Sequence, residues 1–166
     1  MKRLFVFCLA LLTASCGYHL GGFKRASMQN LETFCINMFE NHSVYSNISM
    51  QVTTALADQM QRDGTYRMAS RDECDFVVSG VVTSVSASGL RTNAGDTYVS
   101  SEIGLTVHVS YSVRDTRSGK TVASGNVSAE GSYFNKTGNV QTARDSALSY
   151  AARKAAEIIV QNLTMP

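Results

Sequence analysis

Three consecutive segments of the chain alternate between hydrophobic and polar residues, as strands with one buried face do. The clearest is 103–113, where every second residue is hydrophobic. The segment 76–87 begins as an apolar run and then alternates, which favours a long central strand that emerges toward solvent. A third alternation, 123–133, follows a polar loop at 115–120, where Gly119 is available for a positive backbone angle. Together they predict an antiparallel meander with one apolar and one polar face.

Two further segments have helical periodicity. Between residues 46 and 63, hydrophobic residues recur at intervals of three or four and draw one stripe: Ile48, Val52, Ala55, Leu56 and Met60. Ser46 is a candidate N-cap, and Gly64 is placed to end the helix in the left-handed conformation. Residues 140–163 carry a stripe of mostly small side chains, which lets a helix lie close to a sheet.

The apolar segment 33–39 predicts one strand ahead of the first helix, followed by a polar turn at 40–43, and residues 66–69 are a candidate brief strand. In chain order the main elements are strand, helix, three strands and helix. They predict an α+β two-layer sandwich, with two helices packed on one face of a mixed, mostly antiparallel four-stranded sheet.

The start of the chain has the features of an export signal. Two basic residues precede a nine-residue apolar run, 4–12, which is about half of the roughly 18 residues needed to span a bilayer. The small residues Ala14 and Ser15 then precede Cys16, a pattern typical of a bacterial lipoprotein cleavage site, where the cysteine sulfur receives a diacylglyceryl group. An ordinary signal peptidase site beside a free cysteine is the alternative.

These features divide the chain into three parts. We predict a removed lipoprotein signal peptide at 1–15, a lipidated N-terminus and tether at 16–30, and a single domain at 31–166. Two or three acyl chains on Cys16 would anchor the domain stably. The formal net charge of +2 falls to zero when Lys2 and Arg3 leave with the signal, so the basic footprint of a nucleic-acid partner is absent.

Four cysteines occur, of which Cys8 leaves with the signal and Cys16 is the predicted anchor. Cys35 and Cys74 remain in the folded domain. In an exported protein they are a possible disulfide. The alternative is two buried small apolar side chains with free thiols.

Candidate catalytic residues are scarce. His19, His42 and His108 stand at no spacing that defines a metal or nucleophile motif, and no phosphate loop or other cofactor motif is present. His108 lies on the polar side of its strand, as a solvated histidine would. The acids at 72–75 precede a strand and are expected at a solvated edge. We therefore predict no catalytic residue, no metal site and no cofactor.

Basic residues at loop tips are the remaining candidates for binding. Arg91 lies at the tip between the two longest predicted strands, and Lys136 follows the last strand. Arg117 and Lys120 lie in the opposite hairpin loop. Each of the four is equally well explained as a solvated loop cation.

The order of the elements and four stretches of sequence resemble the LptE family, the lipopolysaccharide-assembly lipoproteins of the outer membrane. The stretches are CGYHL at 16–20, INMFENHS at 36–43, DFVVSGVVTS at 75–84 and RDTRSGKTV at 114–122. With the order of the elements, the match spans nearly the whole mature chain. The sequence departs from the family pattern at Ser43, where Thr is usual, and in lacking prolines near the first strand.

The resemblance implies a non-enzymatic role. It implies a protein that plugs the lumen of an LptD-like β-barrel, assists its assembly and helps to deliver lipopolysaccharide to the outer leaflet. Arg91 and Lys136 fall in regions like those that the family uses against lipid A phosphates. Gly17, rather than Asp, after Cys16 permits passage to the outer membrane by the sorting habit of enteric bacteria. A polar sheet face suits a barrel lumen.

A second resemblance indicates an alternative function, that of a lipid-anchored protein with a different partner. The element order and the hairpin at 115–120 are also similar to periplasmic lipoproteins of the CsgG and LpoB kind, which build secretion pores or activate peptidoglycan synthases.

Overall fold

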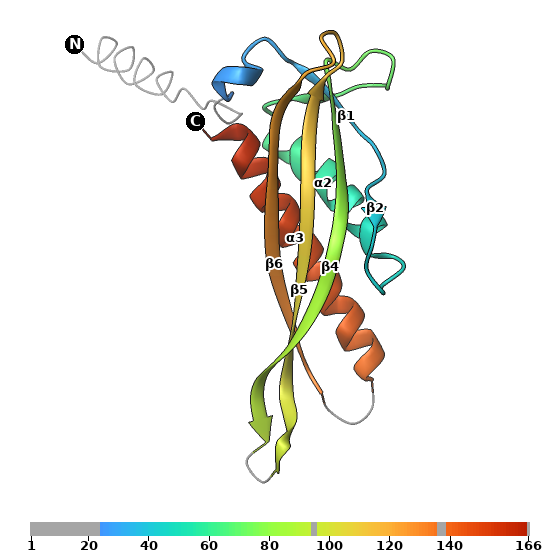
Figure 1. Cartoon of the computed structure of the whole chain (residues 1–166), viewed down its shortest axis with the longest axis vertical. Helices are drawn as coiled ribbons and strands as arrows, with labels where there is room; N and C mark the ends of the chain where they lie inside the picture. Colours follow the sequence, from blue (N-terminus) through green and yellow to red (C-terminus); the bar gives the residue numbers. More distant parts are fainter. Residues whose placement is uncertain (1–23, 94–95, 136–138, 166) are drawn as a thin grey trace, which may run out of the picture.

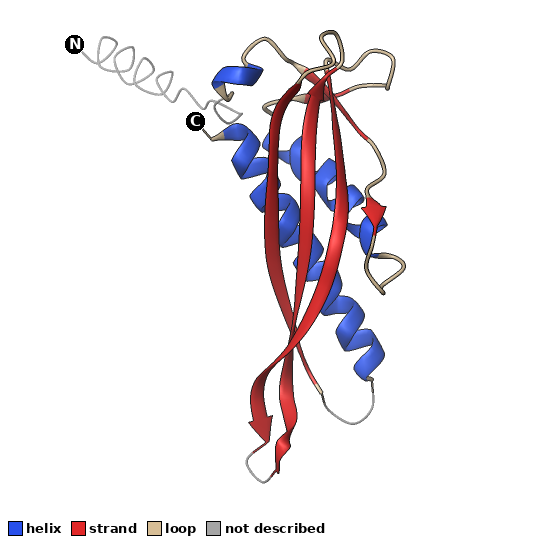
Figure 2. Cartoon of the chain, viewed as in Figure 1, coloured by secondary structure: helices blue, strands red, loops and turns tan. Residues whose placement is uncertain are grey.

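Residues 24–93, 96–135 and 139–165 are described in the computed structural model of this chain. They form a long twisted sheet with both helices on one face, as Figures 1 and 2 show. The elements in chain order are η1 (Ala26–Met28), β1 (Thr33–Ile36), β2 (Glu40–Asn41), α2 (Ile48–Asp63), β3 (Arg67–Met68), β4 (Phe76–Asn93), β5 (Asp96–Asp115), β6 (Thr121–Phe134) and α3 (Val140–Thr164). The predicted α+β fold with two helices and a mixed sheet is confirmed.

The meander of β4, β5 and β6 is the body of the sheet. The strand order is β3-β1-β4-β5-β6, and β2 also pairs with β4. The pairs β4–β5 and β5–β6 are antiparallel, whereas β1, β2 and β3 join the sheet in parallel pairs. The predicted alternation is confirmed, because Leu105, Val107 and Val109 are buried while the intervening side chains face the other side.

The prediction of four strands is wrong, because the described sheet has six. The expected strand at 33–39 is interrupted, and its continuation β2 occupies residues expected to form a polar turn. The interruption comes from Phe39, whose ring packs over Gly80, where a Cβ atom would lie 2.3 Å from a ring carbon. The backbone N–H of Phe39 leaves the ladder and donates to Thr53 Oγ1 at 3.0 Å.

The sixth strand is β3, the candidate brief strand. It contributes only the pairs of Arg67 with Thr33 and Met68 with Phe34 at the edge of β1. A two-residue ladder is too short to produce a periodic pattern in the sequence. Tyr66 secures it, since its ring packs edge-on against Phe76 with centroids 5.0 Å apart.

Helix α2 begins one residue later than predicted. Asn47, not Ser46, takes the N-cap position, and no side chain caps the helix. The preceding loop is organised by Asn41, whose amide donates to the carbonyls of Tyr45 and Ser46 and whose Oδ1 accepts from Ser43. The predicted end is confirmed, because Gly64 adopts a φ of 73° and its N–H donates to the Met60 carbonyl.

Helix α3 lies close to the sheet, as its small side chains predict. Ala151, Ala155 and Ala156 are fully buried. The closest approach is at Gly131 in β6, where a Cβ atom would lie 2.2 Å from the Ala147 carbonyl oxygen. Small side chains on the helix and a glycine on the strand together permit this contact.

Two bulges change which face β4 presents. Val82 pairs with Val109 and Ser84 with His108, so Thr83 is an extra residue. The positions that face the core accordingly change from the buried even residues Phe76, Val78 and Val82 to the odd residue Val85, which is partly buried against the core. The second irregularity leaves Leu90 as an extra residue between Gly89 and Arg91.

Strands β4 and β5 extend beyond the last residue of β6. Phe134, at the end of β6, pairs with Glu102, and past this point only β4 and β5 continue, as a two-stranded ribbon at the lower end of Figure 1. We call its described residues, 89–93 and 96–102, the ribbon. An isolated two-stranded ribbon is marginally stable in water.

Candidate functional site

The sheet face that points away from the helices is covered with short polar side chains. We call it the outer face; its central residues are Ser84, Ser86 and Ser88 from β4, Thr106, His108, Ser110 and Ser112 from β5, and Ser124, Asn126 and Ser128 from β6. These positions include no Asp, Glu, Lys or Arg. The centre of the outer face therefore offers uncharged hydroxyl and amide groups. Charged side chains begin toward the ribbon end, with Glu130, which pairs with Thr106, and Glu102.

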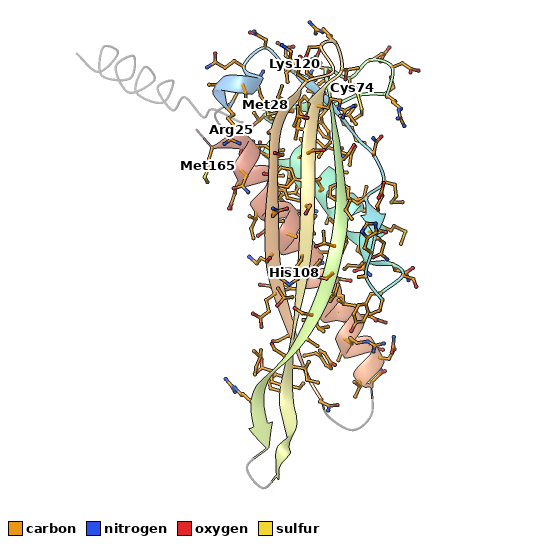
Figure 3. All side chains as sticks on the ribbon, viewed as in Figure 1. Arg25, Met28, Cys74, His108, Lys120 and Met165 are labelled. Carbon is orange, nitrogen blue, oxygen red and sulfur yellow. A yellow bond between two sulfur atoms is a disulfide. The ribbon has the colours of Figure 1, made fainter. Side chains whose placement is uncertain are left out.

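Hydrogen bonds connect the outer face across its strands. Ser110 Oγ donates to Asn126 Oδ1 at 2.6 Å, and His108 contacts Ser128 Oγ through Nδ1 at 2.8 Å and Ser86 Oγ through Nε2 at 3.3 Å. A cavity of about 340 Å³ opens here beside the Thr83 bulge. In Figure 3, His108 lies part-way along the sheet. Its described partners are hydroxyls, so it joins a polar network and no carboxylate orients it as a catalytic base.

A second feature lies at the base of the ribbon, where Arg91 faces Glu102 across the strands. Arg91 Nε lies 3.3 Å from Glu102 Oε2, with the Arg91 side chain 71% exposed and that of Glu102 only 15% exposed. The other carboxylate oxygen of Glu102 accepts from Ser132 Oγ at 2.8 Å. One carboxylate thus links β4, β5 and β6.

Asp75 organises the opposite end of the sheet. Its carboxylate accepts hydrogen bonds from the backbone N–H groups of Glu32 and Thr33, from the Thr33 hydroxyl and from the Arg117 guanidinium. These donors, the Glu32 N–H first, hold the pKa of the Asp75 carboxyl far below its usual range. The prediction of a solvated edge is wrong for Asp75, because its side chain is only 14% exposed. One feature of the sequence points to this role: Asp75 stands directly before the apolar run that begins at Phe76.

Cys35 and Cys74 form a disulfide at this same end, with their Cα atoms 5.7 Å apart. Both residues are buried. The bond ties β1 to the turn that leads into β4. With Asp75, it gives β1, which has only four residues, two additional links to β4.

The segment expected to be part of the tether packs against the domain from Lys24 onward. Met28 is fully buried, and Ser27 Oγ donates to the Val122 carbonyl at 3.0 Å. Lys24 Nζ donates to the Leu31 carbonyl and lies 5.7 Å from the centroid of the Tyr66 ring. Figure 3 places Arg25 and Met28 at the same end of the molecule as Cys74 and Lys120.

The family model for LptE, described as lipopolysaccharide-assembly, matches residues 31–163. This covers most of the chain and includes every strand, α2 and all but the last residue of α3. The chain belongs to the LptE family.

Solved structures share the fold of this LptE-family chain at low sequence identity. A PelC dodecamer from Paraburkholderia phytofirmans is 16% identical, with a TM-score of 0.56 over 87% of this chain and 95% of that one. Protein XCC0632 from Xanthomonas campestris is 9% identical, with a TM-score of 0.55 over 87% and 86%. A candidate lipoprotein from Caulobacter crescentus is 16% identical, with a TM-score of 0.52 over 76% and 88%. No curated protein matches the chain.

The residues predicted to function in this LptE-family chain are not all within the described part. Arg91 lies at the base of the ribbon, on the same side of the sheet as the outer face. Lys136 and the predicted lipidation site Cys16 lie outside the described residues. Of the two hairpin cations, Arg117 contacts Asp75 and Lys120 is exposed.

LptE is a family of non-enzymatic assembly proteins. Among the helices that the structure describes, none is both long enough and apolar enough to cross a membrane. No group of three or more His, Cys, Asp or Glu side chains suited to a metal ion occurs in the described ranges.

Proposed function

We propose that this protein is an outer-membrane lipoprotein, anchored through Cys16, that plugs and helps to assemble an LptD-like β-barrel and assists delivery of lipopolysaccharide to the outer leaflet. Membership of the LptE family supports the lipopolysaccharide-assembly role. The Cys16 anchor rests on the lipoprotein cleavage pattern at 14–16.

The outer face is the observation that supports a plug. An exposed sheet face of a soluble protein usually carries charged side chains, since these are mostly exposed. Here the centre of the face has only short hydroxyl and amide groups around His108. The interior of a membrane barrel is polar, and short uncharged groups can approach such a wall without leaving a charge unpaired.

The ribbon end supports a contact with lipopolysaccharide. Arg91 is a largely exposed cation at the base of the ribbon, and charge-assisted hydrogen bonds to phosphate oxygens are among the strong kinds of polar contact. Lys136 follows β6 in the sequence and is proposed as the second cation.

Purification of the full-length tagged chain from outer membranes tests the partner. We expect a β-barrel of the LptD kind to be recovered in one-to-one proportion. Recovery of a peptidoglycan synthase, or of the chain alone as a large ring, would favour the CsgG- or LpoB-like function instead.

Substitutions on the sheet and on α2 test whether the outer face is the surface that docks against the barrel. Ser110→Arg adds a long cation to the centre of the outer face, and we expect barrel recovery to fall at least tenfold. Thr54→Arg adds the same side chain to an exposed position of α2 and is the matched control. Equal recovery with both variants, at equal thermal stability, would contradict docking through the outer face.

A further inference from the structure

The Leu90 bulge determines where Arg91 points. After the Thr83 bulge, Ser86 and Ser88 share the outer face, so an uninterrupted strand would turn residue 91 toward the helices. The extra residue at Leu90 shifts the register, and Arg91 pairs directly with Glu102. Leu90 itself reaches the outer face, since its Cδ1 atom would lie 3.2 Å from a Cβ at Gly104. The bulge thus presents Arg91 on the same face as Glu102.

Glu102 is the better fixed partner of this pair. Its carboxylate is held by Ser132 on one oxygen and lies against Arg91 on the other, and its side chain is largely buried. Arg91 is the exposed partner. An anion that binds Arg91 therefore meets a guanidinium already close to a carboxylate that stays in place.

A second carboxylate strengthens the negative charge at this point. Glu130 extends from β6 over Gly104, where its Oε1 would lie 2.4 Å from a Cβ atom. Gly104 thus leaves room for Glu130 beside Glu102 and Ser132. Glu130 thus adds a negative charge to the outer face over Gly104, and this charge lowers the attraction of the region for an anion.

We propose that Glu102 is the internal counter-ion of Arg91 and limits how tightly a lipid phosphate binds at the ribbon. The inference rests on the proposed contact between Arg91 and lipopolysaccharide. A protein that passes a lipid onward has to release it, and a resident carboxylate that re-forms its pair with Arg91 favours release. Differences in affinity among variants of one site arise mostly from dissociation rates.

Binding of two lipids to the full mature chain in detergent micelles tests this role. The probes are lipid A carrying both phosphates and lipid A from which the phosphates have been removed. For Glu102→Gln we expect about fivefold tighter binding of the phosphorylated lipid, the size of one exposed charge pair. Binding of the dephosphorylated lipid should not change. Asp58→Asn removes one carboxylate from an exposed position of α2 and should change neither affinity.

Additional variants separate this inference from the proposed function. If Arg91→Gln binds phosphorylated lipid A as tightly as the wild type, both the proposed contact and the role of Glu102 are wrong. If Arg91→Gln weakens binding but Glu102→Gln does not tighten it, only the counter-ion role is wrong. The gain from Glu102→Gln should disappear in the double variant with Arg91→Gln. Glu102→Ser removes the charge with a side chain common on this face and replaces Glu102→Gln if that variant does not fold.

Discussion

The Arg117 guanidinium, in the β5–β6 loop, donates a hydrogen bond to the carboxylate of Asp75, at the start of β4. The same carboxylate accepts the N–H groups of Glu32 and Thr33, so one side chain joins β1, β4 and the hairpin loop. Removing it leaves two backbone donors without their acceptor. Asp75→Ala should therefore lower the free energy of unfolding by about 2 kcal/mol, measured by urea denaturation. Asp72→Ala is the control. Asp72 is exposed in the turn that precedes β4, so its removal should have little effect on the free energy of unfolding.

The Asp75 carboxyl also predicts a pH dependence. Its hydrogen bonds hold its pKa in the folded protein well below the value of about 3.9 expected in the unfolded chain. The stabilisation is therefore complete above that unfolded-state value and is lost as the pH falls through it toward the folded-state pKa. Between pH 5 and pH 2, the wild type should lose stability more steeply than Asp75→Asn. Parallel curves for the two proteins would contradict the assignment.

Gly131 predicts a steric effect. Its Cβ position lies 2.2 Å from the Ala147 carbonyl oxygen, which belongs to helix backbone and cannot rotate away. Gly131→Ala should cost about 2–3 kcal/mol, because α3 must shift from the sheet. Gly125→Ala is the matched control, since the nearest atom there is the Tyr111 hydroxyl oxygen at 2.9 Å, at the end of a side chain. A similar loss in both variants would argue against close helix packing as the cause.

The Cys35–Cys74 disulfide closes a loop with a sequence separation of 39 residues. Replacing both cysteines with serine should lower the free energy of unfolding by about 2–4 kcal/mol, because the unfolded chain is no longer cross-linked. A thiol count on denatured, unreduced protein from the envelope is the direct measurement. Two reactive thiols would exclude the bond in the cell.

Cys16 predicts an acylated protein. Metabolic labelling with a fatty-acid analogue should label the wild type and not Cys16→Ser. Cys8→Ser is the control, because residue 8 lies within the predicted signal and should not alter labelling of the mature chain. Label retained by Cys16→Ser would make the anchor assignment wrong.

Arg91 and Lys136 predict a charge-dependent loss of lipid binding. Arg91→Asp with Lys136→Asp should weaken binding of lipopolysaccharide at least tenfold, because two attractive charges become repulsive. Arg62→Asp with Arg71→Asp makes the same change in net charge elsewhere on the exposed surface. Equal weakening by both double variants would indicate a general effect of net charge rather than a site.

Much of the fold follows from local periodicity. The alternation at 103–113 and 123–133 predicted which side chains the helices cover, and the small side chains of 140–163 predicted a helix close to the sheet. Gly64 ended the first helix as expected. These features are readable because a strand or helix repeats the same environment every second or every third to fourth residue.

The short elements and the polar contacts could not be read in this way. Strands β2 and β3 have two residues each, and the ladder pairs that define them come from β4 and β1, far away in the sequence. Asp75 and Arg117 are separated by 42 positions, as are Asp75 and Thr33. No repeat along the chain encodes such a pairing.

By itself, the sequence determined the two faces of the sheet and the covering helices, and it carries the pattern that predicts an export signal and the resemblance to LptE. Only the tertiary structure decided that Asp75 joins three segments and that bulges at Thr83 and Leu90 turn Arg91 toward Glu102. The physical reason is that the two kinds of feature depend on residues at different distances along the chain. Periodic burial is imposed residue by residue, whereas a register shift or a shared carboxylate depends on which strands meet.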